Sequence, residues 1–194
     1  RTMVAAQAAG AEFAAAARDA GSGKAAGAQK VLENLSKSGL AGYSQLARLR
    51  LAAAAREGGK TEEAVAIYDS IAKEASDPLI AGYANLQAAS LKLDTADWTA
   101  MQNRLNDLTG DTNPWRASAR ELLGLAALKA GKTEEARQQF QKLLVDQSVP
   151  PSLSERARIM MAVLTETELA ASSAPAGSQE KSAAPGSAGA EKSK

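Results

Sequence analysis

The sequence has no cysteine and no histidine, which removes thiol nucleophiles, imidazole bases and the usual zinc ligands together. Aromatic residues make up only 4% of the chain, and the alternation of Val, Ile and Thr that marks β-strands is nearly absent. No run of about 18 apolar residues is present, so we expect no segment of this chain to span a bilayer. These absences favour an all-helical protein that binds other molecules over an enzyme.

A charge excess of either sign is also missing. The chain has 23 Lys and Arg against 22 Asp and Glu, which gives a formal net charge of +1, and the two signs are interspersed. Nucleic-acid binding depends on a cationic stripe that releases counterions from phosphates. We therefore expect no nucleic-acid partner.

One six-residue sequence occurs twice: residues 59–64 and 131–136 both read Gly-Lys-Thr-Glu-Glu-Ala, 72 positions apart. Such a hexamer is typical of a corner between two antiparallel helices. Gly leaves the first helix in a left-handed conformation, Thr caps the next helix, and two Glu lie at its positive N-terminus. Halving the interval gives 36 residues, the length of one helical hairpin, so the pattern predicts a helical-hairpin repeat.

Two columns of small residues follow the 36-residue frame, and small residues let the two helices of a hairpin approach closely. The predicted packing positions are Ala16, Ala52, Ala88 and Gly124 in the first helices and Ala28, Ala64, Ala100 and Ala136 in the second helices. Because alanine is abundant in this chain, the columns support the repeat but the hexamer carries the argument.

The start and stop signals predict four hairpins and one final helix. We expect helices at about 2–20, 24–38, 41–57, 61–75, 78–93 and 97–109, a fourth pair that includes 115–128 and 136–144, and a last helix to about 170. Asp77 before Pro78 and Asn113 before Pro114 are predicted caps, and Ser152 with Glu155 is a predicted capping box. The last helix would cover the apolar edge of the final hairpin.

The third hairpin departs from the pattern. Arg104 and Asp107 stand where the preceding repeat has Tyr68 and Ile71. Because two core anchors are replaced by charged residues, we expect the second helix of this hairpin to be the most solvated and least stable one.

We expect one helical repeat domain over residues 1–171 and a disordered low-complexity tail over residues 172–194. The tail consists of small, polar and charged residues and has no large apolar residue to offset its ordering entropy. The chain opens on Arg1-Thr2-Met3 and leads straight into an Ala-rich helical pattern, unlike a natural start or a signal peptide. We interpret the sequence as a fragment whose N-terminal part has been removed.

The repeat resembles the tetratricopeptide repeat: it has a small residue at its eighth position, Ala at its twentieth, an aromatic residue four further on at Tyr68 and Phe140, and Pro near its end. The resemblance covers about residues 9–149. It implies an all-α fold, a right-handed superhelix of about four helical hairpins with a C-terminal capping helix.

A narrower pattern runs through the last third of the chain. It consists of Trp115, Arg120-Glu121 with Leu122-Leu123, Lys-Ala-Gly-Lys at 129–132, Ala136-Arg137, and Val-Pro-Pro-Ser-Leu-Ser-Glu at 149–155. This pattern is similar to the C-terminal half of the ancillary SecYEG translocon subunit family, the YfgM-like proteins. The pattern of Gly42-Tyr43, Leu46-Ala47 and Leu49 to Ala52 is similar to an earlier repeat of that family.

The narrower resemblance implies the periplasmic domain of a bacterial inner-membrane protein. Such a protein is anchored by one transmembrane helix, which is absent from this chain, and associates with Sec translocon subunits, periplasmic chaperones and unfolded clients. It implies no catalytic residue and does not explain the tail.

In a tetratricopeptide stack the first helix of each hairpin lines a concave groove. Transferred through the 36-residue frame, the candidate groove residues are Phe13, Leu46, Leu49, Asn85, Lys92, Glu121, Leu125, Leu128 and Met161. This mostly apolar surface suits an extended or helical apolar peptide. The alternative is that several of these residues pack the hairpins together or hold the last helix against the groove.

Other site-like features have structural interpretations. The pairs Glu62-Glu63 and Glu134-Glu135 suit the helix dipole, Gly-Lys-Thr lacks the upstream glycine and strand of a phosphate loop, and Trp98 and Trp115 are read as packing anchors. We therefore predict a non-enzymatic protein-binding scaffold with no cofactor or metal. The alternatives are a tetratricopeptide adaptor in cell-envelope assembly or in a cytoplasmic complex, and an enzyme that would need a bound cofactor.

Overall fold

The computed structural model describes residues 2–20 and 24–173, and every regular element within these ranges is helical, so the predicted all-α fold is confirmed. The helices are α1 (Thr2–Asp19), α2 (Ala25–Ser36), α3 (Ala41–Glu57), α4 (Thr61–Glu74), α5 (Pro78–Lys92), α6 (Trp98–Leu105), α7 (Arg116–Lys129), α8 (Thr133–Val145) and α9 (Pro151–Ser173), and a 3₁₀ turn over Asn106–Leu108 follows α6. The tail expected from position 172 lies outside the described residues from position 174 onward.

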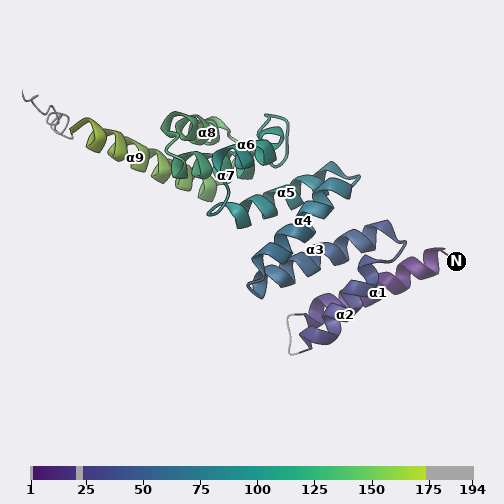
Figure 1. Cartoon of the computed structure of the whole chain (residues 1–194). Helices are drawn as coiled ribbons and strands as arrows, with labels where there is room; N and C mark the ends of the chain where they lie inside the picture. The colour runs from purple at the N-terminus through teal and green to yellow at the C-terminus, as the bar shows by residue number, and fades with distance from the viewer. Residues whose placement is uncertain (1, 21–23, 174–194) are drawn as a thin grey trace, which may run out of the picture.

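Consecutive helices pair into four hairpins, α1 with α2, α3 with α4, α5 with α6, and α7 with α8, and α9 packs on α8 at the end of the series. The hairpins stack into an elongated helical solenoid with α1 and α9 at opposite ends (Figure 1). Each hairpin therefore contacts mainly its neighbours, as in other repeat proteins.

The two copies of the hexamer form the same helix corner. Gly59 and Gly131 have positive φ angles of 73° and 69°. At the first corner the Lys60 N–H donates to the Ala55 carbonyl at 2.8 Å and the Gly59 N–H donates to the Arg56 carbonyl at 3.1 Å. This pair of bonds is the Schellman motif, and it satisfies carbonyl groups that the end of α3 would otherwise leave unpaired. The left-handed glycine predicted at each corner is confirmed.

The predicted threonine caps are wrong. Thr61 and Thr133 are the first residues of α4 and α8, and Lys60 and Lys132 precede them without a side-chain cap bond. The Schellman bonds close the preceding helix at the lysine, so the next helix starts one residue earlier than a threonine cap requires. Asp77 and Asp97 do cap α5 and α6 with their carboxylates.

The capping box predicted at the start of α9 is also absent. The helix begins at Pro151, so Ser152 lies inside its first turn. Proline is favoured at the first helical position because its missing N–H would have no intrahelical partner there.

The second helices of the hairpins present one buried triad each to the core, and these triads recur along the stack. The triads are Ala28, Leu32 and Leu35 in α2; Ala64, Tyr68 and Ile71 in α4; Met101, Leu105 and Leu108 in α6 and its 3₁₀ turn; and Ala136, Phe140 and Leu143 in α8. The first helices contribute Ala16, Ala52, Ala88 and Gly124, which are all buried.

The third hairpin breaks the 36-residue frame by one position, which corrects two expectations. Ala100, a predicted packing position, is exposed, and Met101 takes its place in the core with 1% of its surface exposed. Likewise the core anchors are Leu105 and Leu108 rather than residues 104 and 107. This second helix therefore keeps a full set of apolar anchors, contrary to the expectation that charged residues replace them.

The cap of α6 gives the physical reason. Asp97 is the residue before the helix, and its Oδ1 accepts a hydrogen bond from the Ala100 N–H at 2.8 Å. Thr61, 36 residues earlier, is instead the first residue of α4. The helix in the third hairpin thus starts one residue later, and a shift of one residue turns the buried face by about 100° around the helix.

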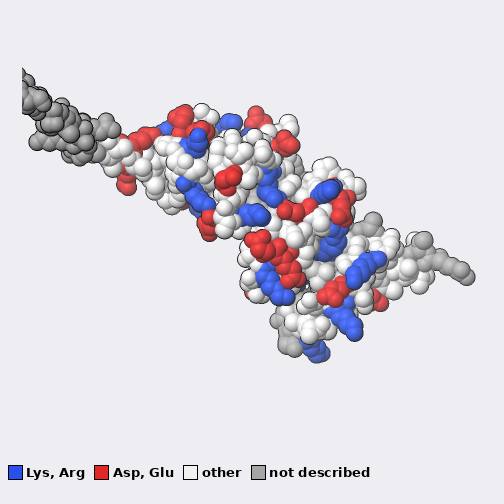
Figure 2. Space-filling view, in the orientation of Figure 1, with Lys and Arg blue, Asp and Glu red and all other residues white. Residues whose placement is uncertain are grey.

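Charges of both signs are interspersed over the face of the solenoid shown in Figure 2, without a broad patch of one sign. Some of the ion pairs in the described part of the chain join two helices, such as Arg104 to Asp69 at 2.5 Å and Arg48 to Glu74 at 2.8 Å. These two pairs are partly exposed, so each contributes little to stability on its own.

Candidate functional site

The apolar groove candidates are mostly engaged in packing. Phe13 packs against the core shared by α1, α2 and α3, and Leu49 packs against the core shared by α3, α4 and α5. Leu46, in the second turn of α3, keeps 42% of its surface exposed. The N-terminal half of the solenoid therefore retains an accessible apolar side chain on a first helix.

The groove candidates near the C-terminus lie where the last helix packs on the fourth hairpin. Leu125 and Leu128 of α7 and Met161 of α9 are half-buried and pack against one common cluster that also contains Leu164. Their position agrees with the alternative interpretation, in which these residues hold the last helix against the groove. They leave little open apolar surface in this repeat.

Two of the polar groove candidates already have partners. The Glu121 carboxylate accepts hydrogen bonds from Arg156 Nε at 2.5 Å and from Nη2 at 3.0 Å, which ties α9 to α7 and raises the pKa of the Arg156 guanidinium. Asn85 Oδ1 accepts from Arg104 at 3.4 Å. Lys92 lies half-buried in the last turn of α5. The structure does not bring these three polar residues together into one cluster.

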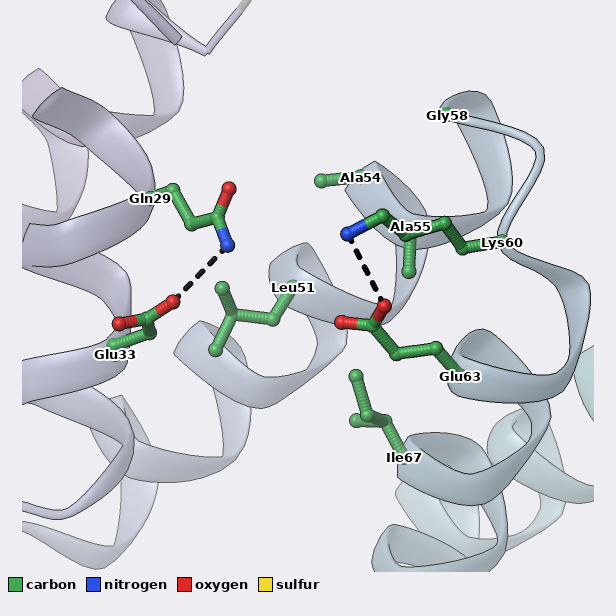
Figure 3. Close-up of a pocket in the computed structure, with 9 residues that line it drawn as sticks. All are labelled: Gln29, Glu33, Leu51, Ala54, Ala55, Gly58, Lys60, Glu63 and Ile67. Carbon is green, nitrogen blue, oxygen red and sulfur yellow. Dashed lines mark hydrogen bonds and ion pairs between the residues drawn. The ribbon is translucent and has the colours of Figure 1, made fainter. Parts of the chain in front are cut away.

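A cavity of about 330 Å³ lies between α2, α3 and α4, at a place that the 36-residue frame does not indicate (Figure 3). Its wall is mostly apolar along α3 and α4. The apolar lining consists of Leu51, Ala54, Ala55 and Ile67, and Gly58 lies at the end of α3. Lys60 and Glu63 of the first corner hexamer also line the cavity.

Two polar pairs border this cavity. Gln29 Nε2 donates to Glu33 Oε1 at 3.0 Å on α2, and Lys60 Nζ lies 3.3 Å from Glu63 Oε2 at the start of α4. In Figure 3 the Leu51 side chain lies between the two pairs. An apolar wall with carboxylates at its border suits an aliphatic side chain that ends in a cationic or amide group.

A second cavity of about 340 Å³ adjoins the first and shares its wall of Gln29, Leu51 and Ala54. It adds the carboxylate of Glu57 and the guanidinium of Arg50. The Arg50 Nη2 atom donates to the Ala17 carbonyl at 3.3 Å, whereas its Nε atom is buried without a hydrogen-bond partner in the described part of the chain. Because the two cavities share this wall, we refer to them together as the α3 recess.

Sequence reasoning missed the α3 recess because its lining comes from three helices at unrelated spacings. The only available signal was the corner hexamer itself, since Lys60 and Glu63 belong to it. By itself the hexamer indicates only a helix corner. A recess beside a repeated corner depends on the size of side chains in the neighbouring hairpin, which the period does not encode.

A charged cluster at the other end of the molecule fixes the loops around α7. Arg120, with only 3% of its surface exposed, donates to the Thr109 carbonyl at 3.0 Å and to Asp111 at 2.5 Å. Arg116 Nε donates to Asp146 at 2.7 Å, and Asp146 also accepts from Ser148. Because both guanidinium groups are paired, we interpret this cluster as a structural clamp.

The clamp changes the ionisation of its carboxylate. The hydrogen bond from Arg116, together with those from the Ser148 hydroxyl and backbone N–H, holds the pKa of Asp146 well below its ordinary value. The same pair raises the pKa of the Arg116 guanidinium. Asp146 is therefore charged over the whole physiological pH range.

Two further properties of the described residues bear on other functions. No group of three or more Asp or Glu side chains lies close enough there to hold a metal ion. None of the helices within residues 2–20 and 24–173 has both the length and the apolar character needed to cross a bilayer.

Comparison with known proteins gives one match. The sequence profile of a family described as tetratricopeptide repeat-like domain matches residues 2–154, which covers all four hairpins and the first residues of α9. Neither the curated proteins nor the solved structures include a match to the chain.

Proposed function

Because the chain belongs to the tetratricopeptide repeat-like domain family, we propose that it is a non-enzymatic scaffold that binds another protein along its helical stack. Solenoids of this type expose long surfaces that take extended or helical peptides, and side-chain pockets select the sequence. The N-terminal half of the solenoid is the region we assign to binding.

The observation that carries this assignment is the difference between the two halves. In the C-terminal half Leu125 and Leu128 of α7 and Met161 of α9 pack against one shared cluster. In the N-terminal half Leu46 is exposed on α3, and the α3 recess lies open on the same helix. The partner is therefore expected to contact α3 with apolar side chains.

The charged residues around the α3 recess indicate which kind of partner segment would bind there. The α3 recess is bordered by Glu33, Glu57 and Glu63 against the cations Arg50 and Lys60, so carboxylates are in excess. A partner segment that carries Lys or Arg beside aliphatic residues would place its stem on the apolar wall and its charge among these carboxylates.

More specifically, we propose that the chain is the periplasmic domain of a membrane-anchored accessory subunit of the Sec translocon. Such a subunit would link the translocon to periplasmic chaperones or to emerging polypeptides. The support is the sequence similarity around Trp115 and residues 149–155 described above, and the anchor would lie in a segment outside this chain.

The test is to purify the full-length tagged protein from detergent-solubilised membranes and to identify its partners by mass spectrometry. Enrichment of translocon subunits or periplasmic chaperones would support the finer proposal. Recovery of envelope-assembly or cytoplasmic proteins instead would favour the alternative of a different tetratricopeptide adaptor, and would leave the general scaffold function in place.

The binding surface is tested with photo-crosslinking side chains placed at Leu46 for the groove and at Ala54 for the α3 recess. The control position is Val145 at the end of α8, which is 78% exposed and distant from both surfaces in the fold. Crosslinks to the partner at Leu46 or Ala54 but not at Val145 are expected. Crosslinks at Val145 alone would overturn the assignment to the N-terminal half.

A further inference from the structure

The outward face of α9 carries a regular stripe of residues with no cover in the described structure. Spacings of four and three residues alternate along it, which is the pattern of a seam between two packed helices. The residues of this seam are Ser152, Arg156, Ile159, Val163, Glu166 and Ala170. Ile159 is 50% exposed and Val163 is 39% exposed, so the stripe presents two adjacent branched aliphatic side chains to solvent.

The same face is covered in the preceding hairpin. Arg120, Leu123 and Ala127 hold the corresponding positions of α7, 36 residues before Arg156, Ile159 and Val163. There the three residues are 3%, 2% and 0% exposed. Leu123 packs with α6, Ala127 packs with α8, and Arg120 binds the Thr109 carbonyl and Asp111 in the loop before α7. The seam of α9 is thus the face on which a repeat of this kind places another helix.

Residues 174–194 contain no Leu, Ile, Val, Met, Phe, Tyr or Trp, so they have no large apolar side chain that could pack on the seam. Burying Ile159 and Val163 requires apolar side chains of similar size from another helix.

The order of residue types along the seam identifies that helix. Along the seam the residue types are small, cationic, aliphatic, aliphatic, anionic and small. The first and last, second and fifth, and third and fourth positions each lie equally far from Met161 along the chain. Such a seam is complementary to itself when a second copy runs antiparallel to it. A two-fold interface has this property, since residue i contacts residue j and residue j contacts residue i.

We propose that two copies of this chain dimerise through an antiparallel pairing of their α9 helices centred on Met161. Ile159 of each copy packs against Val163 of the other, and Arg156 of each copy pairs with Glu166 of the other. Ser152 lies opposite Ala170 at both ends, where small side chains let the helices approach.

The existing contacts of Arg156 are compatible with this pairing. Its Nε and Nη2 atoms bind Glu121 within the same copy, and 54% of its side-chain surface remains exposed. A guanidinium group has five N–H donors, so Nη1 is available for Glu166 of the second copy. The seam is about 27 Å long, and so short an interface is expected to associate in the micromolar range or more weakly.

The register is tested by disulfide crosslinking, which is clean here because the chain has no cysteine. Two single variants, Ile159→Cys and Val163→Cys, are purified and mixed under mild oxidation. The mixture is expected to form a crosslinked dimer at least about ten times faster than either variant alone. Leu169→Cys is the matched control, because Leu169 is 63% exposed on α9 but lies off the seam.

The charge pairing is tested by sedimentation velocity from about 1 µM to about 1 mM. Glu166→Arg is expected to weaken the dimer at least about tenfold, because it places a second guanidinium group opposite Arg156 of the other copy. Mixing this variant with Arg156→Glu should restore association, since the pairs again have opposite charge. Circular dichroism checks that Arg156→Glu, which loses its bond to Glu121, is folded.

Three results would overturn the proposal: a wild-type chain that stays monomeric over this concentration range, a Glu166→Arg variant that dimerises like the wild type, or a cysteine mixture that crosslinks no faster than the Leu169→Cys control.

Discussion

The ring of Phe140 fills the space beside Gly124. A Cβ atom on Gly124 would lie 2.8 Å from Phe140 Cζ and 2.9 Å from Cε1, closer than real Cβ contacts allow. Phe140 itself is fully buried between α7 and its neighbours. In this hairpin the first helix therefore lacks a side chain where the other three repeats have alanine.

Changing Gly124 to Ala should destabilise the protein even though alanine favours helices more than glycine does. Intrinsic propensity alone would stabilise α7 by about 0.5–1 kcal/mol. The overpacked contact with Phe140 costs about 1–3 kcal/mol, so the free energy of unfolding should show a net fall of about 1 kcal/mol, and of no more than about 2.5 kcal/mol. Urea unfolding followed by circular dichroism measures this difference.

The matched control is Gly27→Ala. Gly27 is exposed in the first turn of α2, and a Cβ there meets nothing within 4 Å, so this variant should be as stable as the wild type or slightly more stable. Adding Phe140→Leu to Gly124→Ala should relieve the clash, because the first repeat combines Ala16 with Leu32 at these positions. A Gly124→Ala variant as stable as Gly27→Ala would contradict the close contact.

The register of α6 gives a second prediction. Leucine in place of Ala64 or Ala136, both 0% exposed, should lower the free energy of unfolding by about 1–3 kcal/mol through overpacking. Leucine in place of Ala100, which is exposed, should change it by no more than about 0.5 kcal/mol. Thermal unfolding of the three variants distinguishes the two cases. An equal loss of stability at all three positions would mean that Ala100 is buried like Ala64 and Ala136, as the strict 36-residue frame predicts.

The 36-residue period predicted the glycine corners correctly but failed at Ala100. The 72-residue interval predicted both glycine corners, because a left-handed residue at a helix end needs glycine and leaves a direct sequence signal. The halved interval failed at Ala100, because the connection before α6 ends in an Asp cap rather than in a Schellman corner. A one-residue shift in the start of a helix is invisible to a period, yet it changes which face of the helix is buried.

The candidate site was less accessible to sequence reasoning than the fold. The frame identified which residues lie on first helices, but it did not distinguish the exposed Leu46 from Leu125, which packs near α9. The α3 recess depends on side chains from three helices, and Gln29 and Glu33 have no motif that links them to Lys60. Surfaces of this kind follow from packing between hairpins rather than from order along the chain.

The glycine corners give a third prediction. Replacing Gly59 or Gly131 with Ala should cost about 1 kcal/mol each, because their positive φ angles are unfavourable for a residue with a Cβ atom. The two corners are far apart, so the double variant should lose about the sum of the two. Gly42→Ala in the first turn of α3 is the control, because a Cβ there meets nothing within 4 Å. Chemical denaturation measures all four variants, and a loss for Gly42→Ala equal to that for Gly59→Ala would show that conformation is not the cause.

The clamp at Asp146 predicts a pH dependence of stability. In the folded protein the pKa of this carboxyl lies well below its ordinary value of 3.8, chiefly because of the hydrogen bond from Arg116. A carboxyl with a depressed folded pKa stabilises the protein fully above its unfolded pKa, and this contribution is lost as the pH falls through that value toward the folded pKa. The stability that Asp146 provides should therefore be complete above about pH 5 and should decline below about pH 4.

The variant Asp146→Asn isolates this contribution. It should be less stable than the wild type at pH 7, because Arg116 loses its charged partner, and the difference between the two proteins should shrink as the pH falls from about 5 to about 2. Urea midpoints at several pH values measure that difference directly. Glu12→Gln, at an exposed position of α1, is the control and should differ little from the wild type at any pH. If the gap between Asp146→Asn and the wild type stayed constant down to about pH 2, the depressed pKa of Asp146 would not be the source of the stability, because by that pH the carboxyl of the unfolded chain is protonated while that of the folded protein still loses its proton.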